Sequence, residues 1–344
     1  MKKVISLLTV AVLLLGLAAC GTPSDETSQP ADSAPESVEE SVPTETAPTL
    51  TISAIQGPTG VGLVNLMAAD TAKTAVLDYE FTVCTTPQEA MTKLTNGDVL
   101  LASVPTNVAA TLYNKTNGGI RILAINTGNV LSILENGNTI QSVADLKGKT
   151  IYSTGQGANP EYVLRHLLTK NGLDPDKDVT IEFLAENTEL ATMLASGKAS
   201  VALVPQPVAT TAMLNNQALR VALDVGAEWA KITTDGSQPV MGCLIAKADT
   251  VAKYPQTIAT FLTEYEASIK AANADVATTA THCETYGIIA KAAVAKAAIP
   301  HCGLQFTAGA DMQKLLQGYY EVLFNANPSA VGGAVPEAAF YYVP

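Results

Sequence analysis

The chain has few of the residues on which enzyme chemistry commonly depends: 344 residues include three histidines, five cysteines and one tryptophan. It contains no G-x-S-x-G elbow of a serine hydrolase, no H-E-x-x-H helix of a zinc peptidase and no complete G-x-G-x-x-G dinucleotide motif. A Gly-Lys-Thr sequence at 148–150 imitates the end of a phosphate-binding loop, but Val143 stands where the first glycine belongs. We therefore expect a protein that is not an enzyme and needs no cofactor and no metal.

Positive charge is also scarce, with 20 Lys and Arg against 32 Asp and Glu, a formal net charge of −12. Seven of the acids lie in residues 21–49, which contain no Lys or Arg and are rich in Pro, Ser and Thr. This composition is typical of a disordered acidic tether. The remaining residues, 50–344, still carry a formal charge of about −7. The excess of acids argues against nucleic acid and anionic membrane surfaces as partners.

The only long uncharged apolar run lies near the start of the chain. Lys2 and Lys3 precede apolar residues 4–19, which are fewer than the roughly 20 residues that a membrane-spanning helix needs. The run ends in Leu-Ala-Ala-Cys20, which resembles the lipobox of bacterial lipoproteins. We expect residues 1–20 to be a signal peptide and Cys20 to be lipidated. Two acyl chains on Cys20 would anchor the protein outside the cytoplasm, at the bacterial cell membrane.

Beyond residue 50, short apolar runs alternate with helical patterns, which predicts an α/β fold with parallel or mixed sheets. The expected strands are Leu50–Ile55, Glu80–Thr85, Val99–Val104, Thr150–Ser153, Val179–Leu184, Ser200–Val204, Arg220–Leu223 and Met241–Ala246. The expected helices begin near Val61 and cover Glu89–Leu94, Pro255–Asn273, Val276–Tyr286, Ile288–Ala298 and Ala308–Asn325. About 295 residues are enough for two lobes with separate cores.

An internal repeat appears when the chain is compared with itself at an offset of one hundred residues. Eight residues between Leu94 and Thr111 recur between Leu194 and Thr211. Gln56-Gly57 recurs as Gln156-Gly157 at the same offset. Any two strand-loop-helix units look somewhat alike, but a shared offset in two separate units favours one duplicated lobe.

Each repeat contains loops between a strand and a helix that are rich in Gly, Pro, Thr, Asn and Gln. Such loops let the backbone approach a ligand, and ligands of open α/β sheets bind at the carboxyl ends of strands. None of the four loops contains Lys or Arg, which favours a neutral polar ligand or a modest anion. The same residues can also act only as helix caps. The residues expected to contact a ligand are Gln56, Gly57, Pro58, Thr59, Gly60, Thr106, Asn107, Asn126, Thr127, Tyr152, Gln156, Gly157, Asn159, Gln206 and Trp229.

Several stretches resemble the type II solute-binding proteins of ABC importers for nitrate, taurine, aliphatic sulfonates and thiamine pyrimidines. They are Ser142–Thr150, Gly172–Pro175, Leu203–Pro207, Met241–Ala246 and Lys253–Pro255. The resemblance implies two lobes joined by a two-strand hinge, with crossings near Ile133–Glu135 and Val240–Leu244. Lobe 1 would comprise residues 50–134 and 241–344, and lobe 2 residues 135–240. Many relatives have an acidic residue where this chain has Gln206, which argues against a cationic ligand group.

The resemblance also implies a function: a monomer captures a small polar solute between its lobes and delivers it to a permease with its ATPase. Two solute classes stay open, a sulfonate-like anion and a planar heterocycle. The alternative is an enzyme or ligand sensor built on the same fold, for example in pyrimidine or menaquinone-precursor metabolism.

Two further features leave alternatives open. Trp229 could stack on a planar solute or anchor the core of a lobe, and Tyr152 has the same ambiguity. Cys283 and Cys302 could form a disulfide in an exported protein or remain buried thiols. The neighbouring His282 and His301 suggest zinc, but adjacent helical residues point about 100° apart and would rarely bind one ion, so no metal is expected.

Overall fold

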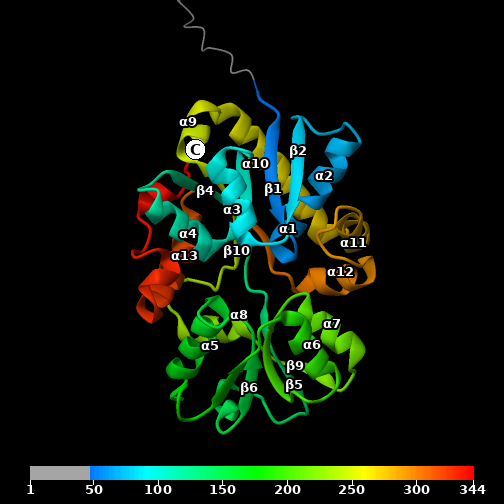
Figure 1. Ribbon diagram of the computed structural model, residues 1–344, viewed down its shortest axis with the longest axis vertical. Coiled ribbons are helices and arrows are strands. Elements are labelled where there is room, and N and C mark those ends of the chain that lie inside the picture. The colour runs from blue at the N-terminus through cyan, green and yellow to red at the C-terminus, as the bar shows by residue number, and fades with distance from the viewer. Residues whose placement is uncertain (1–46) are drawn as a thin grey trace, which may run out of the picture. The chain divides into compact units, whose positions relative to one another are not determined.

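The computed structural model describes residues 47–344, which form two β-sheets flanked by helices (Figure 1). The predicted signal peptide, Cys20 and nearly all of the predicted tether lie outside the described residues. The strands are β1 Leu50–Ile55, β2 Tyr79–Cys84, β3 Leu101–Pro105, β4 Ile120–Thr127, β5 Leu131–Asn136, β6 Thr150–Ser153, β7 Thr180–Phe183, β8 Val201–Pro205, β9 Leu219–Asp224, β10 Gly242–Lys247 and β11 Leu304–Thr307.

Most predicted helices begin and end within about three residues of the predicted positions, but the one predicted over Ile288–Ala298 begins only at Ala292, and the one predicted from about Val61 is two short helices. They are α1 Pro58–Val61, α2 Val64–Thr71, α3 Pro87–Asn96, α4 Thr106–Lys115, α5 Asn159–Lys170, α6 Asn187–Ala195, α7 Val208–Asn215, α8 Val225–Ile232, α9 Ala248–Lys253, α10 Pro255–Ala274, α11 Val276–Thr285, α12 Ala292–Ala298 and α13 Asp311–Ala326. Within residues 47–344, none of these helices is both long enough and apolar enough to cross a membrane.

The first sheet has six strands in the order β11-β4-β10-β3-β1-β2. Strands β1, β2 and β3 are parallel, whereas β10 runs antiparallel between β3 and β4. The central strands β3, β4 and β10 are buried along nearly their whole length. Burial on both faces explains why their sequences are nearly continuous apolar runs without alternation. This sheet and the helices on its faces form lobe 1.

The second sheet repeats this plan with five strands in the order β7-β6-β8-β5-β9. Strand β5 runs antiparallel between β8 and β9, as β10 does between β3 and β4. Equivalent strands begin about 100 residues apart, as in β1 and β6 or β3 and β8. Gly97 and Gly197 both follow a helix with positive φ, of 86° and 73°, a conformation that favours glycine at helix ends. The shared order supports the duplication inferred from the sequence. The second sheet and α5–α8 form lobe 2.

The chain crosses between the sheets at two places, and the first prediction was placed too late. Strand β4 belongs to the first sheet and β5 to the second, so the first crossing lies at residues 128–130. Residues 133–135, expected at the hinge, instead pair with β8 and β9. The return crossing occupies residues 233–241, between α8 and β10. Strands β4, β5 and β11 were not predicted. Strands β4 and β5 form one apolar stretch that only the short crossing interrupts, so the sequence does not show where the first sheet ends.

Candidate functional site

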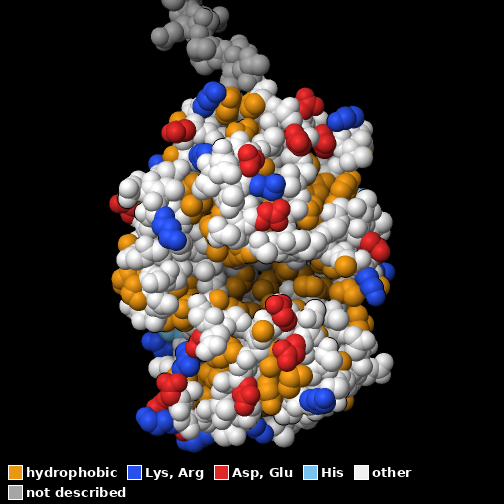
Figure 2. Space-filling model, viewed as in Figure 1, with side chains coloured by type: hydrophobic (Ala, Val, Ile, Leu, Met, Phe, Trp, Pro, Cys, Tyr) orange, Lys and Arg blue, Asp and Glu red, His pale blue; other side chains and the backbone are white. Residues whose placement is uncertain are grey.

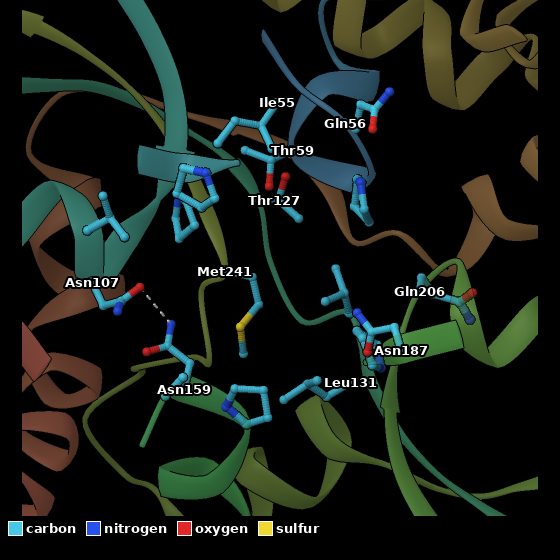
Figure 3. Close-up of a pocket in the computed structure, with 18 residues that line it drawn as sticks. Ile55, Gln56, Thr59, Asn107, Thr127, Leu131, Asn159, Asn187, Gln206 and Met241 are labelled. Atoms are coloured by element: carbon cyan, nitrogen blue, oxygen red, sulfur yellow. Dashed lines mark hydrogen bonds between the residues drawn. The ribbon is translucent and has the colours of Figure 1, made fainter. Parts of the chain in front are cut away.

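A pocket of about 460 Å³ lies between the two lobes, a size within the usual range for small-molecule sites (Figure 3). Figure 2 shows the hollow between the upper and lower halves of the molecule. The pocket is formed mainly by loops at the carboxyl ends of β1, β3, β6 and β8, where α/β sheets bind ligands. Its lining residues are Ile55, Gln56, Pro58, Thr59, Pro87, Pro105, Asn107, Val108, Thr127, Val130, Leu131, Ala158, Asn159, Pro160, Asn187, Pro205, Gln206 and Met241.

Three asparagines mark the places where helices start at this pocket. Asn107 is the second residue of α4, Asn159 is the first residue of α5, and Asn187 is the first residue of α6. None of these three helices has a side-chain cap at its N-terminus. Uncapped N-termini present backbone N–H groups and a partial positive charge of about half an elementary charge each. Their convergence suits an oxygen-rich anionic group.

The side-chain oxygens of Asn107, Asn187 and Gln206 accept protein hydrogen bonds, whereas that of Asn159 is buried without a partner. Asn159 Nδ2 donates to Asn107 Oδ1 across the two lobes at 3.2 Å (Figure 3). The Thr154 hydroxyl donates to Asn187 Oδ1 at 2.7 Å. The oxygen of Gln206 accepts the Thr210 hydroxyl at 2.7 Å and also the Thr210 N–H at 3.3 Å, and so helps to cap α7. These bonds leave the amide nitrogens of Asn107, Asn187 and Gln206 as the ends that can donate to a ligand.

The lining of the pocket carries no charged side chain and no aromatic ring. Acids instead occupy the first turns of surrounding helices, with Glu89 on α3, Glu161 on α5 and Glu189 on α6. Figure 2 shows acidic side chains on the rim below the hollow. The lysines of α3, α4 and α5 lie in their last turns, at the ends far from the pocket: Lys93, Lys115 and Lys170. The site therefore offers neutral donors and no compensating cation.

The structure brings about half of the predicted ligand contacts together. Those that line the pocket are Gln56, Pro58, Thr59, Asn107, Thr127, Asn159 and Gln206. Those that do not are Gly57, Gly60, Thr106, Asn126, Tyr152, Gln156, Gly157 and Trp229.

The residues outside the lining have other contacts that explain their positions. The Thr106 hydroxyl is buried and donates to the carbonyl of Val240 at 2.5 Å. Asn126 lies behind the lining, where its oxygen accepts the Thr127 hydroxyl at 2.8 Å. Tyr152 packs against the core of lobe 2, and Gln156 and Gly157 are exposed. These residues support the walls of the pocket or face solvent.

Trp229 is a core residue, which decides between the two interpretations of this side chain. It is fully buried, and its ring lies 4.9 Å from the ring of His166 and 5.8 Å from that of Tyr319. His166 and Trp229 belong to lobe 2, whereas Tyr319 belongs to α13. Burial lowers the pKa of His166, with a smaller contribution from Lys170. The ring therefore fills the seam between lobe 2 and α13 and is not available to stack on a solute in the pocket.

Sequence reasoning missed several lining residues, notably Pro87, Asn187, Leu131 and Met241. The repeat could have identified one of these residues from the other. Pro87 and Asn187 are equivalent at the offset of one hundred, and each begins the helix that follows the second strand of its lobe. Leu131 and Met241 lie at the two crossings, whose positions relative to the pocket depend on the sheets.

Cys283 and Cys302 are both buried free thiols in the structure. Burial raises the pKa of Cys302 to about 12, and the neighbouring Cys283 adds to the shift. Neutral buried thiols at this pKa behave as small apolar side chains. Nearby, His282 Nδ1 lies 2.8 Å from Asn65 Oδ1.

Comparison with known proteins assigns the chain to a family. The profile of the periplasmic substrate-binding proteins of phosphonate ABC transporters matches residues 65–283. The chain belongs to this family. A search of curated proteins finds no match.

Solved structures share the fold at low sequence identity. An ABC transporter protein from Parabacteroides distasonis is 20% identical, with a TM-score of 0.71 over 86% of this chain and 98% of that chain. The periplasmic aliphatic sulphonate binding protein of Escherichia coli is 16% identical, with a TM-score of 0.68 over 87% and 93%. The alkanesulfonate-binding protein of Xanthomonas axonopodis pv. citri, bound to MOPS, is 15% identical, with a TM-score of 0.59 over 86% and 96%. These similarities confirm the two-lobed α/β fold that the sequence predicts.

Proposed function

We propose that this family member captures a small organic oxyanion between its lobes, outside the cytoplasm, and delivers it to the permease of an ABC importer. The observation that carries the proposal is the convergence of three uncapped helix N-termini, each marked by an asparagine, on a pocket without charged side chains. Backbone N–H groups and amide nitrogens would hold the oxygens of a sulfonate or phosphonate group. The family profile and the sulfonate-binding structural relatives support this class of solute.

The rest of the lining suits a short aliphatic part of the solute. Apolar side chains make up most of the lining, including Pro58, Pro205, Leu131 and Met241. No aromatic ring lines the pocket, and Trp229 is fully buried elsewhere. A planar heterocycle would find no stacking partner, so the anion is the better of the two solute classes.

Closure of the lobes would occur about the two crossings. Residues 128–130 and 233–241 are the only links between the sheets in the described chain. Gly303 lies against the first crossing and its carbonyl accepts a hydrogen bond from Gly128 N at 2.8 Å. Its φ is +57°, and a Cβ there would lie 2.4 Å from the Asn129 carbonyl oxygen. Glycine at this position therefore lets the start of β11 pack close to the backbone of the first crossing. Lipidation of Cys20 would keep the closed protein near its permease and ATPase.

Binding can be tested by thermal unfolding of the purified protein with alkylsulfonates, alkylphosphonates, pyrimidines, amino acids and sugars. A ligand that binds only the native state stabilises it by about 2.7 kcal/mol at a hundredfold excess over its dissociation constant. We expect a shift with the sulfonates or phosphonates alone. Trp229 is the only tryptophan, so a change in its fluorescence on binding would report closure at the seam. A shift with pyrimidines alone would contradict the proposal, and a shift with no class would favour the enzyme or sensor alternative.

A further inference from the structure

We infer that the pocket selects solutes by charge, binding a headgroup that carries one negative charge and rejecting one that carries two. This inference rests on the proposed function and concerns the same site. It would make the capture of a phosphonate depend on pH through the ionisation of the solute, while the capture of a sulfonate would not change with pH.

The first support is the positive charge that the site can supply. No lysine, arginine or histidine lines the pocket, so the described residues offer only helix N-termini and neutral donors. The three uncapped N-termini of α4, α5 and α6 together supply about one and a half elementary charges of partial positive charge. That amount can balance one negative charge on a bound headgroup. A second negative charge, removed from water, would lack a partner, and burial of an unpaired charge is costly.

The second support is the set of charged groups around the pocket, which lowers the positive potential further. Glu161 lies in the first turn of α5, accepts the N–H of Gly157 at 2.7 Å and pairs with Arg165 at 2.7 Å. Arg165 also pairs with Asp176 at 2.8 Å, so this cluster keeps a net negative charge. It therefore adds no positive charge to the start of α5.

Two other helices around the pocket, α3 and α6, also carry acids in or next to their first turns. Glu186 is the N-cap residue of α6 and Glu189 lies in its first turn. Glu89 lies in the first turn of α3 and accepts the N–H of Thr85 at 3.1 Å. The first turns of α1, α4 and α7 contain no acid, and no base occupies the first turn of α3, α5 or α6. The acids in the first turns of α3, α5 and α6 therefore repel a dianion, and Lys291, which lies near the N-cap residue Pro207 of α7, is outside the pocket lining.

Sulfonates and phosphonates differ in the charge that their headgroups carry near neutral pH. A sulfonate carries one negative charge throughout the physiological range. A phosphonate, like a phosphate ester, loses a second proton near neutral pH and becomes a dianion. If only the monoanion binds, the apparent dissociation constant rises in inverse proportion to the fraction of monoanion.

The test is isothermal titration calorimetry of the full-length mature protein with propane-1-sulfonate and propylphosphonate, which share an alkyl chain. At about pH 5.5 and about pH 9, we expect the sulfonate affinity to be equal within twofold, while the phosphonate affinity falls by about fivefold or more. The sulfonate is the internal control, because any titration of the protein itself would change both affinities.

The possible results separate this inference from the proposed function. Phosphonate binding that is unchanged or tighter at the higher pH, or absent at the lower pH while the sulfonate binds, overturns the charge selection and leaves the proposed function intact. Failure of both probes at both pH values overturns the proposed function as well. A variant, Pro87→Lys, adds a cation to the lining without removing an asparagine donor, and should flatten the pH dependence for the phosphonate while the sulfonate still binds. An unchanged pH dependence in a variant that binds the sulfonate contradicts the inference.

Discussion

The two lobes have the same strand order but differ in the chemistry built on it. The pairing of β5 with β9 places Glu135 opposite Arg220 in lobe 2. The equivalent pairing of β10 with β4 places Ala246 opposite Arg121 in lobe 1. Arg220 bonds to Glu135 at 2.6 Å, whereas Arg121 donates only to backbone carbonyls, those of Gly118 at 2.7 Å and Ile120 at 2.9 Å. Lobe 2 thus pairs its arginine with a buried glutamate, whereas the equivalent arginine of lobe 1 is bonded to nearby backbone carbonyls.

The two lobes also differ in the residues that line the pocket. Four pairs of lining residues are equivalent at the offset of one hundred: Pro58 with Ala158, Thr59 with Asn159, Pro87 with Asn187, and Pro105 with Pro205. In the second and third pairs, lobe 2 supplies an amide where lobe 1 supplies a hydroxyl or a proline. Duplication therefore preserved these lining positions, while the side chains at them diverged. This difference can be tested by substituting equivalent residues in the two lobes.

The largest expected effect comes from the paired core leucines Leu94 and Leu194, both of which are fully buried. Leu94→Ala and Leu194→Ala should each lower the free energy of unfolding by about 2–5 kcal/mol, because each leaves a cavity in the core of its lobe. Urea unfolding followed by circular dichroism measures both. A cost below 1 kcal/mol for one variant would show that the two cores are not equivalent in packing, despite their shared topology.

A smaller effect is expected from the arginines. Arg220→Gln leaves the buried Glu135 without its cation and should cost about 1.5–3 kcal/mol, whereas Arg121→Gln breaks only neutral carbonyl bonds and should cost about 1 kcal/mol. Equal costs in urea unfolding would contradict the contrast between the lobes.

The ion pair also predicts a pH dependence. Burial by itself would raise the pKa of Glu135, but hydrogen bonds from Thr139, Ile140 and Arg220 outweigh it and hold the pKa below its ordinary value. Because the folded pKa is lowered, this stabilisation is present above the usual range of a glutamate and is lost as the pH falls through the folded pKa. Glu135→Gln should therefore lose less stability than the wild type on acidification, as unfolding at several pH values would measure. An equal loss in both proteins would assign acid sensitivity to other carboxylates.

The smallest expected effect concerns solute binding. Asn159→Ala removes the bond that holds the Asn107 amide in the pocket, and should weaken propane-1-sulfonate binding by about 1–2 kcal/mol. Thr59→Ala, its equivalent in lobe 1, should weaken it by about 0.5–1 kcal/mol. Trp229→Phe is the control, since the ring lies outside the pocket and the affinity should not change. Calorimetry compares the three variants, and a larger loss for Thr59→Ala would contradict the greater role expected of Asn159.

The sequence alone determined the parts of this protein that local patterns encode. Strands such as β1 and β6 and helices such as α10 were predicted to within a residue or two, because their apolar periodicity and bounding residues are local properties. The repeat showed that two similar lobes exist, and the rule for α/β sheets indicated which loops would face a ligand. Thr59 and Asn159 followed from these local features.

Tertiary structure decided the rest. The first crossing could not be located, since β4 and β5 are equally apolar and only strand pairing assigns them to different sheets. Trp229 carries the same ring whether it stacks on a solute or fills a core, so only the packing of Tyr319 and His166 against it separates the two roles. Asn187 reaches the pocket because the loop after β7 ends beside the loop after β6, where Thr154 bonds to it. Contacts between segments far apart in sequence have no local signature, and they determined which of the polar loop residues form one site.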